Sequence, residues 1–108
     1  MIEALFKRES CNLVSVTLKG HAESVNQGYD MVCSAASAIS QTTVIGITEV
    51  LKLKLNYCIK DGFLSFSLKD MKEDDILKCQ VLVETMLLGL KSIEFNFSEY
   101  INVKVEEV

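Results

Sequence analysis

The sequence predicts an α+β fold in which two helices pack on one mixed β-sheet, with the element order ββαββαβ. Three observations lead to this prediction. Apolar and polar residues alternate in several short segments, which is the pattern of half-buried strands. Two longer segments instead have the apolar faces of helices. An Asp-Gly pair at residues 61–62 separates two of the alternating segments and is typical of a hairpin turn.

The first two strands are predicted over residues 2–8 and 13–19, joined by a turn over residues 9–12. Because side chains of a strand point alternately to its two faces, the apolar positions of both segments fall on one side of this hairpin. That side is expected to face the helices. The residues that form it are Ile2, Ala4, Phe6, Val14, Val16 and Leu18.

Residues 20–28 are mostly small or polar and are predicted to form a loop, and a long helix follows over residues 31–52. Asp30 is suited to be its N-cap, because a carboxylate accepts hydrogen bonds from the free amides of the first turn. The run over residues 31–48 carries no charge and is long enough to cross a membrane. Ser, Thr and Gln residues interrupt it, so a buried core helix is the better interpretation. Gly46 is an interior weak point and a candidate for close packing.

The second half of the chain repeats the pattern of hairpin and helix. Strands are predicted over residues 55–60 and 63–69, and both residues of the Asp-Gly turn between them are expected to have positive φ. A second helix is expected to begin at the acidic residues 73–75, whose charges suit a helix N-terminus, and to end near Lys91. The last strand is predicted over residues 100–105. The buried stripe of the second helix is expected to contain Ile76, Val83, Leu87 and Leu90.

Composition limits the class of partner. The chain has 108 residues and a formal net charge of -4, which fits a single domain over residues 1–108. Nucleic acid is not expected as a direct partner, because the basic residues are scattered rather than clustered. The N-terminus lacks the pattern of a signal peptide, so we expect a cytoplasmic location, no membrane partner and free thiols. A second copy would cover any apolar helix surface left exposed, so a homodimer is expected.

One histidine and one cysteine are placed for nucleophilic chemistry. His21 is the only histidine and follows the end of a predicted strand, and Cys33 is expected in the first turn of the long helix. A helix N-terminus stabilises a thiolate, which is the reactive form of cysteine, and imidazole is the usual base for it. The backbone amides of Cys33 and Ser34 are candidate donors to an oxyanion. No cofactor is needed for this chemistry.

Other interpretations of these residues stay open at this level. A free cysteine is usually a buried core residue, and this is the favoured interpretation of Cys11, Cys58 and Cys79. Spacing alone does not make Cys33 and His21 a specific signal either. Cys11, His21 and Cys33 could supply three zinc ligands, but their spacings match no metal pattern, and no metal is expected.

A longer pattern around these residues resembles the signature of the ribosomal-processing cysteine protease family, Prp. That signature is GHA, a short gap, then G-x-D-apolar-V-C-A/S-x-x-S. The gap between His and Cys is the same here, and length and element order are similar over the whole chain. The residues that carry the resemblance are Gly20-His21-Ala22 and Gly28-Tyr29-Asp30-Met31-Val32-Cys33-Ser34-Ala35-Ala36-Ser37.

The resemblance implies roles for single residues. Cys33 resembles the family nucleophile, and His21 resembles its base. Asp30 would either cap the helix or orient the imidazole. Ser37 would support the thiolate or, as the favoured interpretation, hydrogen-bond within its own helix.

The resemblance also implies an activity. Members of the family remove an N-terminal extension from the large-subunit ribosomal protein numbered twenty-seven, and the segment that they cut is apolar with aromatic residues near the cut. Gly20 and Gly28 would bracket a mobile loop that shapes the substrate cleft. The implied partner is therefore a ribosomal protein precursor.

Two other functions would use the same residues. A non-catalytic ribosome-assembly factor would hold the peptide without cutting it, although binding alone does not need the Cys/His pair. A thiol-dependent hydrolase or acyltransferase acting on a small molecule predicts a deep, small pocket. A peptidase predicts an open groove that accepts an extended chain.

Overall fold

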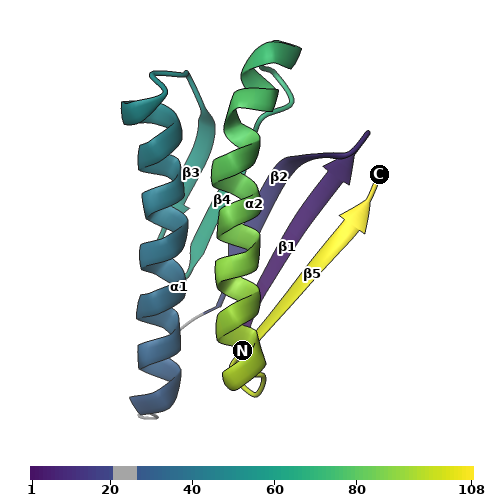
Figure 1. Ribbon diagram of the computed structural model, residues 1–108. Helices are drawn as coiled ribbons and strands as arrows, with labels where there is room; N and C mark the ends of the chain where they lie inside the picture. Colours follow the sequence, from purple (N-terminus) through teal and green to yellow (C-terminus); the bar gives the residue numbers. More distant parts are fainter. Residues whose placement is uncertain (21–26) are drawn as a thin grey trace.

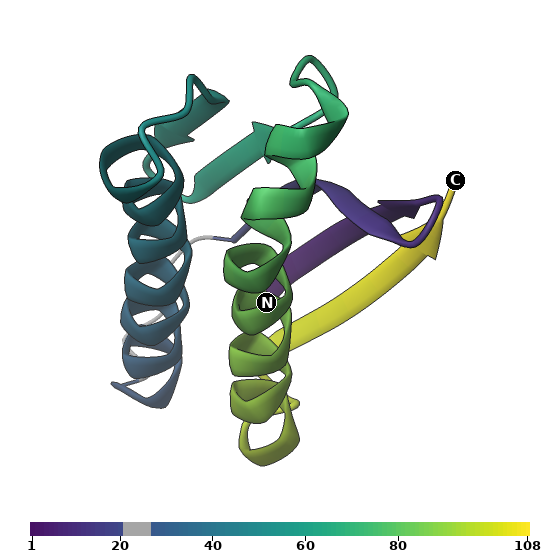
Figure 2. The ribbon, with the colours of Figure 1, turned by 45° about the horizontal axis from the view of Figure 1, so that its top comes forward.

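The structure, a computed structural model, describes residues 1–20 and 27–108 and confirms the order ββαββαβ. Two helices lie side by side on one face of a five-stranded sheet (Figures 1 and 2). The elements are β1 (Ile2–Glu9), β2 (Asn12–Lys19), α1 (Gln27–Ile45), a π-helical turn η1 (Gly46–Val50), β3 (Asn56–Lys60), β4 (Phe63–Ser67), α2 (Glu73–Asn96) and β5 (Ile101–Glu107).

The sheet is mixed, as the sequence predicts, and its strand order is β3-β4-β2-β1-β5. β5 pairs with β1 in parallel, whereas every other neighbouring pair is antiparallel. The parallel pair needs a long crossover connection, which α2 supplies. In Figures 1 and 2, α1 lies towards the β3 edge of the sheet and α2 lies towards the β5 edge.

The core lies between the sheet and the two helices. All six residues predicted for the inner face of the β1–β2 hairpin are buried, and all of them except Val14 belong to this core cluster. From α2, Val83, Leu87 and Leu90 are buried as predicted, and Ile76 packs against the same cluster while partly exposed. The helix continues to Asn96, past the predicted end near Lys91.

The start of α1 differs from the prediction. The helix begins at Gln27, so Asp30 lies inside the first turn and is not the N-cap. An N-cap residue must have non-helical backbone angles, and the backbone at Asp30 is already helical. The C-terminal end is also distinctive, because Lys52 adopts a left-handed φ of 59° two residues after η1 ends. A left-handed residue at this place ends a helix and is usually glycine.

Gly46 is the close-packing site that the sequence predicts. A Cβ atom added to it would lie 2.9 Å from Cδ1 of Leu82 on α2. Residues 30–50 are long and apolar enough to cross a membrane by length and composition alone, and 33% of the most apolar window is buried in the fold. A single core helix of a globular domain meets the same criteria, so this finding adds little to the sequence-based interpretation.

Polar contacts attach α2 to the sheet. Arg8 on β1 donates two hydrogen bonds to Glu84, with Nη1–Oε2 and Nη2–Oε1 distances of 2.7 and 3.2 Å. This contact raises the pKa of the Arg8 guanidinium above its ordinary value. Gln80 both accepts from the amide of Leu13 and donates to its carbonyl, at 2.8 and 2.9 Å. These contacts fix the β1–β2 hairpin on the helix.

The two hairpin turns differ from expectation in their backbone angles. In the Asp61–Gly62 turn only Gly62 has positive φ, at 72°. In the β1–β2 turn, Ser10 and Cys11 both have positive φ, at 50° and 72°. Two consecutive left-handed residues form the turn type whose twist matches a β-hairpin, and Asn-Gly is its preferred sequence. The strained positions are therefore occupied by Ser and Cys.

Replacing Ser10 by Asn together with Cys11 by Gly is expected to stabilise the fold by about 1 kcal/mol, because Asn and Gly adopt left-handed angles at lower cost. The free energy of unfolding in urea measures the effect. Cys11→Ala is the matched control, since it removes the thiol but keeps a Cβ atom in the strained conformation. A double variant no more stable than this control would contradict the turn assignment.

Candidate active site

A cavity of about 500 Å³ lies where the end of β2, the N-terminal half of α1 and the β3–β4 hairpin meet. It is neither enclosed nor flat, and it lies towards the β3 edge of the sheet. Cys33 is among its lining residues. The lining residues are Cys33, Ser34, Ala36, Ser37, Ala38, Ser40 and Gln41 from α1; Leu18, Lys19 and Gly20 from the end of β2; Ile59, Lys60, Asp61, Gly62, Phe63 and Leu64 from the hairpin; and Ile2 from β1.

Helix periodicity explains why Cys33 faces this cavity. Val32 and Ala36 are buried in the core cluster, and Cys33 and Ser37 each follow one of them, so they lie beside the buried face of the helix. Cys33 is therefore partly exposed while it still packs against the core cluster. A nucleophile needs this combination, because its sulfur must be reachable and its position fixed.

Cys33 is not in the first turn of α1, contrary to the prediction. Counting from Gln27, it is the seventh residue and lies in the second turn. The field of a helix dipole falls off within the first turn, so the helix terminus contributes less to a thiolate here than the sequence suggested. The amides of Cys33 and Ser34, which are predicted as oxyanion donors, lie inside the same helix, and this role stays a prediction. In a helix that begins at Gln27, both amides donate to carbonyls four residues earlier.

His21, the predicted base, lies outside the described residues. The structure does describe Gly20, the residue before it, and Gly20 lines the same cavity as Cys33. The Gly20 amide donates to the carbonyl of Gly62 at 3.0 Å, which fixes the end of β2 on the hairpin turn. Gly28, expected at the far end of a loop, is instead the second residue of α1. Helical backbone at Gly28 does not support the hinge role predicted for it.

The supporting residues of the motif lie on α1. Ser37 Oγ accepts a hydrogen bond from Gln41 Nε2 at 2.8 Å, which agrees with the favoured interpretation of a contact within the helix. Asp30 is exposed and is not among the cavity-lining residues. Gln41 was not predicted, although its spacing of eight residues from Cys33 places it on the same helix face. No sequence pattern predicts the residues of the β3–β4 hairpin that line the cavity, because strand pairing brings them beside α1.

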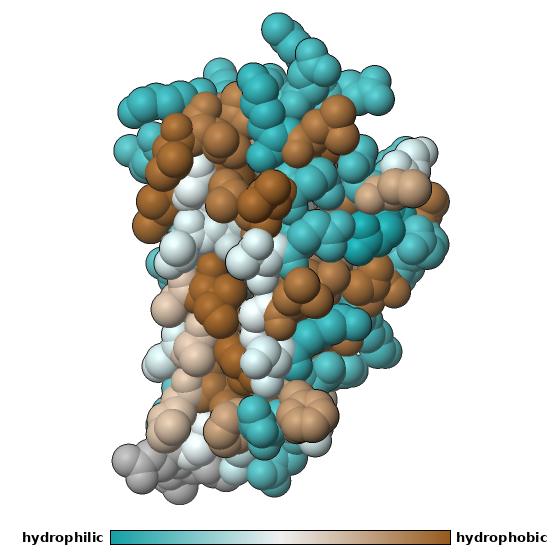
Figure 3. Space-filling view, viewed as in Figure 1, coloured by the Kyte–Doolittle hydropathy of each residue, from teal (hydrophilic) through white to brown (hydrophobic). Residues whose placement is uncertain are grey.

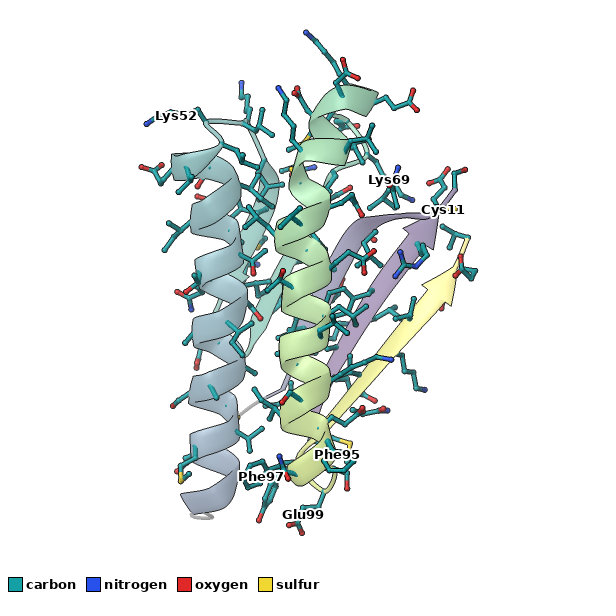
Figure 4. All side chains as sticks on the ribbon, in the orientation of Figure 1. Cys11, Lys52, Lys69, Phe95, Phe97 and Glu99 are labelled. Atoms are coloured by element: carbon teal, nitrogen blue, oxygen red, sulfur yellow. The ribbon has the colours of Figure 1, made fainter. Side chains whose placement is uncertain are left out.

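The remaining cysteines do not join this site. Figure 4 shows Cys11 at the β1–β2 turn, far from α1 on the other side of the view. Because Cys11 precedes β2 and Gly20 follows it, the two residues lie at opposite ends of one strand, and the predicted alternative of zinc bound by Cys11, His21 and Cys33 is not supported. Within residues 1–20 and 27–108, no three His, Cys, Asp or Glu side chains cluster to hold a metal. Cys79 is fully buried in α2, and burial, with the charge of Asp75 as a smaller cause, raises the pKa of its thiol.

Comparisons with known sequences point to one family. The family described as "Cysteine protease Prp" matches residues 1–102 of this chain. A curated relative from Staphylococcus aureus, named "Ribosomal processing cysteine protease Prp", is 31% identical over 94 residues, which cover 84% of this chain and 85% of the relative.

Solved structures give the same result for the fold. A Streptococcus mutans protein of known structure has a TM-score of 0.86 and 32% identity, covering 100% of this chain and 96% of its own. The S. aureus protease Prp with a covalently linked product peptide has a TM-score of 0.82 and 26% identity, covering 98% of this chain and 100% of its own. Its complex with a substrate peptide is similar in fold, with a TM-score of 0.85 at 23% identity, covering 98% of this chain and 100% of its own.

Proposed function

We propose that this chain, which belongs to the cysteine protease Prp family and is a cysteine peptidase, processes a ribosomal protein. Cys33 is the proposed nucleophile. The proposed substrate is the precursor of the large-subunit ribosomal protein numbered twenty-seven, whose N-terminal extension it would remove. The observation that carries the proposal is the cavity that contains both Cys33 and Gly20, the neighbour of His21 in the chain.

The proposed reaction is acyl transfer in two steps. The Cys33 thiolate attacks the scissile carbonyl carbon, and the imidazolium of His21 protonates the leaving amine as the C–N bond breaks. A thioester then links Cys33 to the new C-terminus of the extension. Water, deprotonated by His21, attacks this thioester and releases the carboxylate and the thiol. All bonds in the cycle are made by acid–base and nucleophilic chemistry, so no cofactor is required.

Asp30 takes the second of its two predicted roles in this proposal. Its capping role is removed by the start of α1 at Gln27. Asp30 and Cys33 are three residues apart on the helix, and side chains with this spacing are neighbours on a helix surface. We therefore assign Asp30 to positioning the His21 imidazole beside the thiol.

The shape of the site favours a peptide over a small molecule. The cavity is partly open and lies beside an edge strand, whereas the small-molecule alternative predicts a deep, small pocket. A chain in extended conformation fits such a place, because its backbone groups can pair with a strand or with solvent. No comparable observation favours the assembly factor over the peptidase.

The experiment that tests this function follows the mass of the host's own precursor during incubation with the purified protein. A single cut near the N-terminus is expected, with the mature protein and the extension as products. The mature protein lacking the extension is the control and is expected to remain intact. Binding of the precursor without a cut would replace the peptidase by the assembly factor, and the absence of both would contradict the substrate.

We further propose that the protein acts as a homodimer in the cytoplasm, where ribosomal precursors are made. Figure 3 shows hydrophobic and weakly polar side chains over much of the outer surface of the two helices. Large apolar side chains are exposed on this face, and a partner copy would remove them from water. The residues are Met31, Ile45 and Val50 on the α1 side and Leu77, Val81, Leu88 and Phe95 on α2. Light scattering is expected to give twice the chain mass, and Leu88→Glu is expected to reduce it.

A further inference from the structure

The hydrogen-bonding pattern of the sheet determines which backbone groups of β3 face outward. The Gly20 amide donates to Gly62, and the Leu68 amide donates to Val14, so alternate residues of β4 bond to β2. Between these two contacts, the alternation makes Leu64 and Phe66 bond to β2 and not to β3. Their partners in β3 are Ile59 and Tyr57. The N–H and C=O groups of Tyr57 and Ile59 therefore point away from the sheet, at its open edge.

The side chains of the same two residues present an apolar surface at this edge. Tyr57 is 51% exposed and Ile59 is 41% exposed, although both lie on the sheet face that the helices cover. Ile59 also lines the cavity that contains Cys33. The open edge of β3 is thus continuous with the proposed active site.

The opposite edge of the sheet, formed by β5, is protected against pairing with another strand, unlike the edge formed by β3. On β5 the outward amide of Val103 donates to the Glu94 carboxylate at 2.6 Å, and that of Ile101 donates to Phe97 at 3.3 Å. Acidic residues Glu106 and Glu107 follow in the same strand. Blocked amides and charges are the usual protection of an edge strand. No contact of this kind occupies Tyr57 or Ile59 within the described part of the chain.

We propose that the extended substrate segment binds as an additional strand on the outer edge of β3, and that this pairing brings the scissile bond to Cys33. The proposal rests on the proposed function and specifies how the ribosomal precursor is held. From Cys33 to Gln41, α1 rises by about 12 Å, which matches about four residues of an extended chain. The backbone of Tyr57 and Ile59 supplies affinity for any such chain, and their side chains select apolar residues.

The first test methylates single backbone nitrogens of a synthetic peptide that spans the cut in the precursor. Only alternate amides of an added strand pair with β3, so N-methylation is expected to raise KM about tenfold at every second position and little at the positions between. Cleavage of the unmethylated peptide is the positive control. Failure of this control would count against the proposed function, whereas cleavage with no alternation would overturn the added strand alone.

The second test replaces the outward amide on the enzyme. Ile59→Pro removes an N–H that forms no ladder bond, and proline is tolerated at such positions of edge strands. It is expected to lower kcat/KM for the peptide about tenfold. Val105→Pro is the matched control, because alternation from Val103 makes its amide outward on β5, and it is expected to keep full activity.

Thermal unfolding of both proline variants separates loss of pairing from loss of fold, and the methylation pattern does not depend on any variant. Equal activity of Ile59→Pro and wild type, with both folded, would overturn the proposal. A second result would also overturn it: N-methylation has no alternating effect, and Ile59→Pro dissociates a dimer. Together these findings would assign the β3 edge to a second copy of the chain.

Discussion

Cys33→Ala is expected to abolish cleavage of the precursor, by about four orders of magnitude or more in kcat, because no other group can form the thioester. The fold is expected to persist, since Cys33 is only partly buried and alanine is a good helix former. Peptide binding is expected to remain for the same reason. Cleavage rate, circular dichroism and a fluorescence-binding measurement on one preparation report the three properties.

Cys58→Ala is the matched control for this variant. Cys58 has the same intermediate burial as Cys33 but is not among the residues that line the cavity. Activity close to wild type is expected for Cys58→Ala. Retained cleavage in Cys33→Ala would end the assignment of the nucleophile.

Gly20→Ala is expected to destabilise the fold by about 3 kcal/mol. The backbone at Gly20 has φ of +157°, and an added Cβ would lie 2.8 Å from Cα of Ile2 and 3.0 Å from the carbonyl of Met1. Both contacts are with backbone, so relief requires β1 and β2 to move apart. For a domain of this size the loss corresponds to a fall in the melting temperature of about 15 °C.

Gly89→Ala, in contrast to Gly20→Ala, is expected to increase the stability of the fold. A Cβ at Gly89 would lie 3.7 Å from Ile39 Cδ1, an ordinary contact, in the middle of α2. The variant is expected to be more stable than wild type by about 0.5–1 kcal/mol, because alanine favours the helix. Chemical denaturation of both variants measures the difference. Equal effects of the two substitutions would contradict the close approach at Gly20.

The strands and their inward faces were predictable because alternation reports burial directly. Ile2, Val16 and Ile101 are buried where the pattern indicates. Helix ends were less predictable: Asp30 is a preferred N-cap residue type, so the sequence placed the start of α1 there, whereas the helix already includes Gln27. The left-handed pair Ser10 and Cys11 was missed because neither residue type is typical of that conformation.

The candidate site was predictable only where its parts are local in sequence. Cys33 and Ser37 were found through the motif, and helical spacing extends the same face to Gln41. Ile59 and Phe63 reach the cavity through the pairing of β4 with β2, which has no signal in the β3–β4 segment itself. The open edge of β3 likewise depends on strand order, which alternation does not determine.

The most direct test of the central claim is the intact mass of the protein quenched in acid during turnover of the precursor peptide. A transient gain equal to the mass of the released extension less one water is expected, and peptide mapping is expected to place it on Cys33. This result would establish the thioester and its position together. Cleavage without any adduct on Cys33, or an adduct on Cys58 or Cys79, would contradict the account.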